Sequence, residues 1–287
     1  MNSPKLHHYV PRFYLERFTD PNGRLWAWDK MRDVSFHSSP AGVAAENHFY
    51  RQDDLAELGH DPLTLEKQLA DIEGQIAKIT SRWIEWLGET PARKRIQVPK
   101  TNRDVVALFL CLQYLRTLDA REILSALAAS GRTLLATEQR RLHTSLLWDE
   151  PTFRQIADHF YKSIWVFGRN KTSTPFLTSD NPITFRTADH RQWVRVGIQS
   201  RGVYAGYPLT PEFILFCYDG RHWKWKSLQK FDCSVSPVVF TDKMVESENT
   251  GQVFMASRFV FSNVNHFEEA QDFANAIKTN RYAPRSN

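Results

Sequence analysis

Two adjacent histidines, His7 and His8, are the first residues of the chain that could do chemistry, and they lie in the segment HHYVP. Imidazole titrates near neutral pH, so a histidine can act as a base, as an acid or as a metal ligand. Adjacent side chains of an extended segment point to opposite faces, so only one of the two reaches a given site unless the backbone turns. The pair predicts either a catalytic or metal-binding site or an ordinary pair of surface histidines.

Two carboxylates are the candidates to act with these histidines. Glu46 lies in the polar cluster Glu46-Asn47-His48, and Asp180 lies in TSDNP at residues 178–182. Nitrogen and oxygen ligands suit Mg, Mn or Zn, so we expect His8, Glu46 and Asp180 to hold a divalent metal, although their spacing matches no established ligand motif. The TSDNP run is equally typical of a turn in which Asp180 or Asn181 bonds the backbone.

A guanidinium on an apolar helix is the third candidate. Gln113 and Arg116 are three residues apart and share one helix face, and Arg121 lies near that face. Arginine binds phosphate or carboxylate through two parallel hydrogen bonds, so we expect Arg116 and Arg121 to bind an anionic substrate, with Gln113 and Asn181 as orienting donors. The alternative is a structural ion pair with a carboxylate such as Glu73, because a buried unpaired charge is costly.

Basic and aromatic residues alternate in two places where a nucleic acid could be bound. Residues 93–95 (RKR) lie in a loop between two prolines, and Trp223 and Trp225 alternate with Lys224 and Lys226, the pattern of an edge strand. The net charge of +5 and the pI near 9.1 allow a nucleic-acid partner without requiring one. Arg154 and His159 match an RxxxxH spacing that arises readily by chance in a chain with ten histidines.

The hydrophobic pattern predicts an α+β fold that positions these residues. Apolar residues at intervals of three or four predict helices over residues 63–88, 102–130, 133–147 and 152–161. Short β-branched and aromatic runs then predict strands between residues 163 and 218, and residues 24–29 and 34–36 predict two more. We expect one domain over residues 1–287, in which a helical, bundle-like N-terminal half packs on a mostly antiparallel sheet formed mainly by the C-terminal half. Its regions would be helix-rich (60–162), strand-rich (163–240) and terminal helices with a strand (241–280).

Composition excludes several classes of protein. The longest apolar run covers residues 105–112 and is too short for a membrane span, and the opening MNSPKLHHYVPRF lacks the apolar core of a secretory signal. Cys111, Cys217 and Cys233 are odd in number and widely spaced, which excludes a disulfide scaffold and favours a reducing cytoplasm. We therefore expect a cytoplasmic protein without a membrane partner.

Five motifs together resemble a bacterial family, domain of unknown function 4238. They are HHYVPRFYLERF (7–18), LQYLRTLDAR (112–121), FLTSDNP (176–182), YPLTP (207–211) and ASRFVFS (256–262). The resemblance spans nearly the whole chain, and it implies neither an activity nor catalytic residues. HHYVP, QxxR and SDNP each contain groups that are costly to bury alone, so one shared pocket would satisfy them all, and so would a structural hydrogen-bond hub.

The leading functional hypothesis is a metal-assisted phosphodiesterase or nuclease acting on nucleic acid. His7, His8 and Asp180 would hold the metal or act as a base, with Glu46 as a further ligand, and the metal would lower the pKa of bound water. One alternative is a non-catalytic sensor or interaction protein of a bacterial defence or mobile-element module, with an anion-binding pocket. Another is a small-molecule enzyme that uses the histidine pair without metal. All three depend on whether His7, His8, Arg116 and Asp180 converge.

Overall fold

A seven-stranded mixed sheet is the centre of the molecule. The computed structural model describes residues 6–47, 49, 64–91, 94–129, 133–195 and 200–277, so His48 and Arg93 lie outside the described residues. All neighbours in the sheet are antiparallel except the pair β12 and β6, which is parallel. In spatial order the strands are β5 (Ile96–Gln97), β12 (Ser234–Phe240), β6 (Ile164–Asn170), β11 (Phe213–Tyr218), β10 (Val203–Pro208), β8 (Thr184–Thr187) and β9 (Trp193–Val194).

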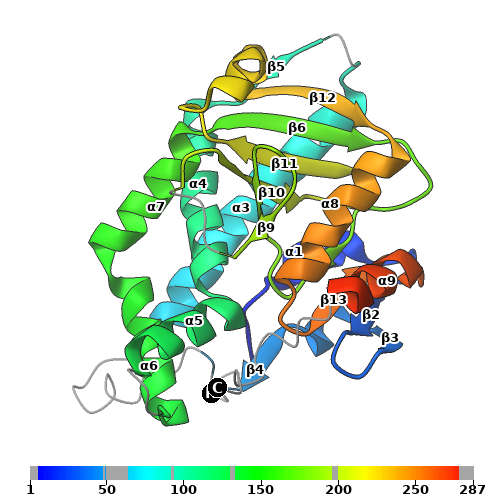
Figure 1. Cartoon of the computed structure of the whole chain (residues 1–287). Coiled ribbons are helices and arrows are strands. Elements are labelled where there is room, and N and C mark those ends of the chain that lie inside the picture. Colours follow the sequence, from blue (N-terminus) through cyan, green and yellow to red (C-terminus); the bar gives the residue numbers. More distant parts are fainter. Residues whose placement is uncertain are drawn as a thin grey trace.

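Both faces of this sheet are covered by helices, because alternate strand residues are apolar on each side. Trp165 and Phe167 of β6 belong to the core under the N-terminal helices, whereas Ile164 and Val166 belong to a second core that includes Val245. The first face is covered by α3 (Thr64–Glu89) and α4 (Lys100–Leu115), and α8 (Asp242–Met255) crosses the other (Figure 1). Around α4 pack α5 (Leu118–Ala129), α6 (Ala136–Trp148) and α7 (Glu150–Lys162).

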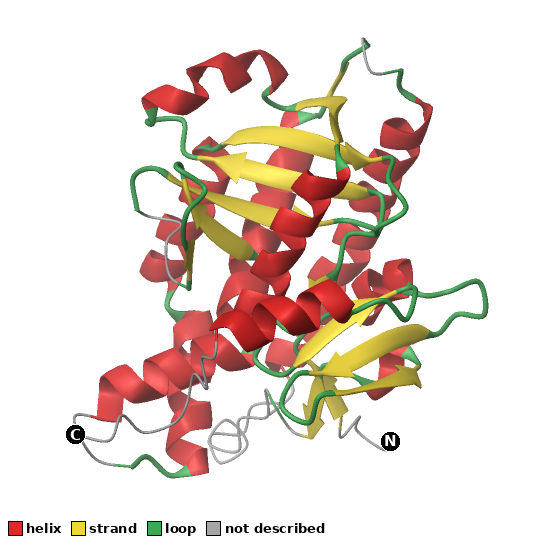
Figure 2. Ribbon diagram, turned by 45° about the vertical axis from the view of Figure 1, so that its right-hand side comes forward, coloured by secondary structure: helices red, strands yellow, loops and turns green. Residues whose placement is uncertain are grey.

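A second, four-stranded antiparallel sheet joins the two ends of the chain (Figure 2). Its order is β3 (Val34–Ser38), β2 (Leu25–Asp29), β13 (Phe259–Ser262) and β7 (Thr178–Ser179). Its apolar face packs with α8 and with α9 (Glu268–Ile277). The N-terminal segment adds a separate pair, β1 (Leu6–His8) with β4 (Ala45–Asn47), and the short helices α1 (Arg12–Leu15), η1 (Glu16–Phe18) and η2 (Pro40–Gly42).

The expected α+β class is confirmed, and two local predictions are wrong. The helix expected over residues 102–130 is two helices that break at Arg116 and Thr117, where the Thr117 hydroxyl accepts the Ala120 N–H and so begins α5. The Trp/Lys alternation of residues 223–226 is not a strand but the start of a 3-10 helix, η3 (Trp223–Phe231). In the part of the chain that the structure describes, no helix has the length and apolarity to cross a bilayer.

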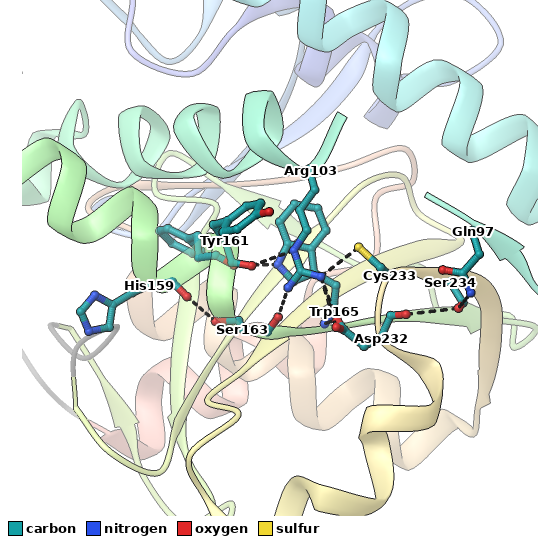
Figure 3. Close-up of polar contacts among 10 residues, drawn as sticks. Gln97, Arg103, His159, Tyr161, Ser163, Trp165, Asp232, Cys233 and Ser234 are labelled. Carbon is teal, nitrogen blue, oxygen red and sulfur yellow. Dashed lines mark hydrogen bonds and ion pairs between the residues drawn. The ribbon is translucent and has the colours of Figure 1, made fainter. Parts of the chain in front are cut away.

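One buried arginine ties the helical layer to the large sheet (Figure 3). Arg103 of α4 donates to the Tyr161 carbonyl at 2.7 Å and to the Ser163 carbonyl, where α7 enters β6. Its Nη1 also donates to both carboxylate oxygens of Asp232, at 3.1 and 3.2 Å, and to the Cys233 sulfur at 2.9 Å. The guanidinium therefore fixes where β12 begins, and the pairing with Asp232 compensates its burial.

Candidate functional site

The strand pair β1–β4 positions the two histidines on opposite faces. His7 lies directly opposite Glu46 in the register of this pair and is buried, and His8 lies opposite Ala45 and is half-buried. This is the alternation that an extended backbone imposes. The two imidazoles therefore have different surroundings, and His8 reaches an open cleft.

His8 is held as a neutral imidazole. Its Nε2 lies 3.3 Å from the Ala41 carbonyl oxygen. A carbonyl can only accept, so Nε2 carries the hydrogen and Nδ1 carries the lone pair of the neutral ring. Burial lowers the pKa of His8, and the bond to Ala41 offsets only part of that effect. At neutral pH, His8 therefore offers an unprotonated nitrogen that can accept a proton.

Arg116 is bonded within the protein, to the partner that the sequence offered as the structural alternative. Its Nη1 donates to Glu73 Oε1 at 2.7 Å, and its Nε and Nη2 donate to Gln113 Oε1 at 3.1 and 2.7 Å. Gln113 in turn donates from Nε2 to the Tyr9 carbonyl at 3.2 Å. This chain of contacts links the break between α4 and α5 to α3 and to the HHYVP segment.

A cleft of about 340 Å³ lies beside His8, between the N-terminal segment and the first half of α3. Glu73 lines it, and the charges of Glu73 and Arg116 both act on His8. Arg12 also lines the cleft, with a side chain 59% exposed and a long contact of 3.7 Å to Glu16. The full lining is His8, Arg12, Phe13, Leu69, Ala70, Glu73, Gly74 and Ala77. Arg12 was not among the residues predicted from the sequence, although it directly follows HHYVP.

Arg121 and Glu46 form a second group. The guanidinium donates to both oxygens of Glu46, at 3.2 and 2.9 Å, and its carbon lies 4.6 Å from the centre of the Phe49 ring. Here the predicted anion-binding arginine and the predicted metal ligand bind each other. The pair joins α5 to the end of β4.

Asp180 and Asn181 form a third group. The Asp180 carboxylate is fully buried and accepts the backbone N–H groups of three consecutive residues, 257–259, at 2.7 to 2.9 Å. Burial raises the pKa of Asp180 to about 6, against the opposing effect of these hydrogen bonds. Asn181 donates to Asp119, which forms an ion pair with Arg195. The Asp180 carboxylate thus holds the turn that leads into β13, a segment far along the chain, whereas the turn interpretation of the sequence placed its backbone bonds within TSDNP.

The three groups are each connected to the N-terminal segment, but they do not line one pocket. His8, Gln113 and Arg116 lie around Glu73, whereas Asp180 does not line the cleft. A hydrogen bond of 2.7 Å between the Tyr14 and Thr178 hydroxyls connects the segment to the TSDNP run. Within the described ranges, no group of three or more His, Cys, Asp or Glu side chains could hold a metal ion. The divalent metal therefore stays a prediction from the sequence, and no chemical step is derived through it.

Comparison with known protein families identifies the family of the chain. The family model described as a protein of unknown function, DUF4238, matches residues 6–266. The chain belongs to this family. No curated protein and no solved structure matches the chain. The DUF4238 match covers the HHYVP segment, the Gln113–Arg116 pair, the TSDNP run and β13, so the function of this DUF4238 protein has to be argued from the contacts of these residues.

Proposed function

We propose that this DUF4238 protein is a hydrolase that cleaves phosphodiester bonds in nucleic acid at the cleft beside His8. The observation that carries the proposal is that His8, an imidazole with a lowered pKa, lines the same cleft as the exposed guanidinium of Arg12. A neutral base and a cation beside each other are the minimum that the hydrolysis of an anionic ester needs.

His8 acts as general acid and base in this proposal. Its Nδ1 takes the proton of the attacking water while the oxygen bonds to phosphorus, and the imidazolium then returns the proton to the leaving oxygen. Arg12 binds the non-bridging phosphate oxygens and stabilises the charge that grows on them. Glu73, fixed by Arg116, stabilises the imidazolium, so Arg116 and Gln113 are positioning residues.

The basic composition supports nucleic acid as the substrate class, since the net charge is +5. The cleft is also lined by Phe13, next to Arg12 in the chain. An aromatic ring together with a cation suits a nucleotide better than an inorganic phosphate.

The test is cleavage of pooled DNA and RNA by the full chain, with EDTA, Mg²⁺ or Mn²⁺ in separate reactions. Replacing a general base costs about 100-fold to 10,000-fold in rate, so His8→Ala should lose nearly all cleavage. The matched control is His266→Ala, which removes an exposed histidine outside the cleft and should cleave normally.

A second variant blocks the cleft without touching its chemistry. Gly74 lines the cleft on α3, and a Cβ at this position would meet no heavy atom within 4 Å. Gly74→Gln should therefore fold, fill the cleft and abolish cleavage while His8 and Arg12 remain. Normal cleavage by both His8→Ala and Gly74→Gln would overturn the proposal, and binding of the pool without cleavage would favour the anion-binding sensor instead.

A further inference from the structure

The 3-10 helix η3 presents a basic and aromatic surface that the proposed function does not use. A 3-10 helix has three residues per turn, so residues three apart share a face. Trp225, Leu228 and Phe231 form the inward face and pack with the second core. The outward faces carry Trp223, Lys226 and Gln229 on one side, and Lys224, Ser227 and Lys230 on the other.

Trp223 is the exposed aromatic residue of this surface. Its side chain is 69% exposed, although tryptophan gains more than almost any other residue from burial. The His222 ring stacks at 26° with its centre 6.1 Å away, and the Lys224 ammonium lies 5.9 Å from the ring centre. Most of the indole therefore remains accessible, as a surface for base stacking requires.

Cations from several elements lie at both ends of η3. Arg95 donates to the Lys230 carbonyl at 2.5 Å and lies over the Phe231 ring at 5.0 Å, so it is held at the end of η3. At the start of η3, Arg221 lines a hollow of about 310 Å³ together with His159 and Lys162. We call this surface the basic patch; it consists of Arg95, Lys162, Arg221, Trp223, Lys224, Lys226 and Lys230.

The acidic groups at the basic patch are few. Asp219 accepts from Arg221 at 2.7 Å, and Asp158 accepts from Lys162 at 2.6 Å. Residues 221–231 themselves contain no Asp or Glu. The patch therefore carries six cations beside these two carboxylates, and Asp232, which follows η3, is bound by Arg103.

We propose that the basic patch binds single-stranded nucleic acid, with one base stacked on Trp223 and the phosphates held by the lysines. Only an unpaired base exposes the flat face that an indole can stack against, which favours a single strand over a duplex. A lipid surface fits less well, because the apolar face of η3 points into the protein and leaves one large apolar side chain to insert. This binding does not depend on cleavage at the cleft beside His8.

The test is fluorescence anisotropy of labelled 20-nucleotide oligo-dT and oligo-U with the full chain at several salt concentrations. Stacking of one base corresponds to about a 5-fold to 150-fold loss of affinity in Trp223→Ala, and Trp223→Phe should restore part of it. Lys226→Ala should reduce the slope of log affinity against log salt by about 0.7.

Matched controls separate the patch from general surface effects. Leu135→Ala removes an apolar side chain that is also 69% exposed, and Lys78→Ala removes an exposed lysine of α3; both should bind normally. The basic patch shares no residue with the cleft beside His8, so a failed cleavage proposal leaves this one intact. Equal affinity of Trp223→Ala and wild type would overturn the proposal, as would binding to anionic lipid vesicles with none to the oligonucleotides.

Discussion

Replacing Arg116 with methionine separates a structural role of this residue from a role in substrate binding. The change keeps the long apolar stem and removes the guanidinium, which is buried and makes three hydrogen bonds to Glu73 and Gln113. We expect the folded state to lose stability, because the acceptor oxygen of the buried Gln113 would be left without these donors.

The expected loss of stability follows from the groups that the Arg116 guanidinium contacts. An orphaned buried acceptor costs about 1–3 kcal/mol, and the lost contact of the guanidinium with the Phe109 ring adds about 0.5–1 kcal/mol. Breaking a buried ion pair costs about 3–5 kcal/mol, but Glu73 is partly exposed and can turn to water, which favours the lower end of that range. The free energy of unfolding should therefore fall by about 3 kcal/mol.

The assay is urea unfolding at pH 7, followed by tryptophan fluorescence. Arg12→Met makes the same chemical change on a side chain that is 59% exposed, and its free energy of unfolding should stay within about 0.5 kcal/mol of wild type. A loss below about 0.5 kcal/mol in Arg116→Met would refute the reasoning. If such a stable variant also lost nucleic-acid binding, Arg116 would be a substrate contact instead.

Three further changes test other parts of the structure. Gly74→Ala removes a mid-helix glycine at a position with room for a methyl group, and thermal melting should show a gain of about 0.5–1 kcal/mol; a lower melting temperature would mean that the site is not open. Burial raises the pKa of Glu248 to about 7. Between about pH 4.5 and pH 7 the folded protein therefore binds a proton that the unfolded chain has lost. The free energy of unfolding should fall by up to about 3 kcal/mol as the pH rises through this range. Glu248→Gln should remove this fall in urea titrations at pH 5 and pH 8, and an unchanged pH dependence would contradict the assignment. Asp232→Asn weakens the acceptor of Arg103 and of the Trp165 N–H, and should lower stability by about 2 kcal/mol in the same urea assay, whereas an effect under about 0.5 kcal/mol would show that this contact is not needed.

Periodicity predicted the regular elements well where one face of an element is buried. The helix expected over residues 63–88 is Thr64–Glu89, and the strands expected between residues 163 and 218 include β6 and end with β11 at Tyr218. The strand Ser234–Phe240 was missed, because a proline at 237 is typical of a break. In the structure the register shifts between Ser234 and Val238, and this irregularity accommodates the proline in a strand.

The candidate site was predicted in its residue types but not in its pairings. Glu73 was named as the structural partner of Arg116 because a buried guanidinium needs one. The bidentate pair of Glu46 with Arg121 and the backbone contacts of Asp180 depend on segments about 75 residues apart in the chain, which local pattern does not reveal. Arg12 was missed because a lone surface arginine carries no signal before the cleft around it is known.

The four-stranded sheet has a consequence for biosynthesis. Its hairpin, β2 with β3, pairs with β13, which is made some 230 residues later, between Asp29 and Phe259. At typical rates of translation the ribosome needs on the order of 10–50 s to reach that partner. During this interval the inner edge of the hairpin, with Trp26 and Trp28, has no strand beside it, so the nascent chain exposes an unpaired strand edge that is prone to aggregation until β13 is made.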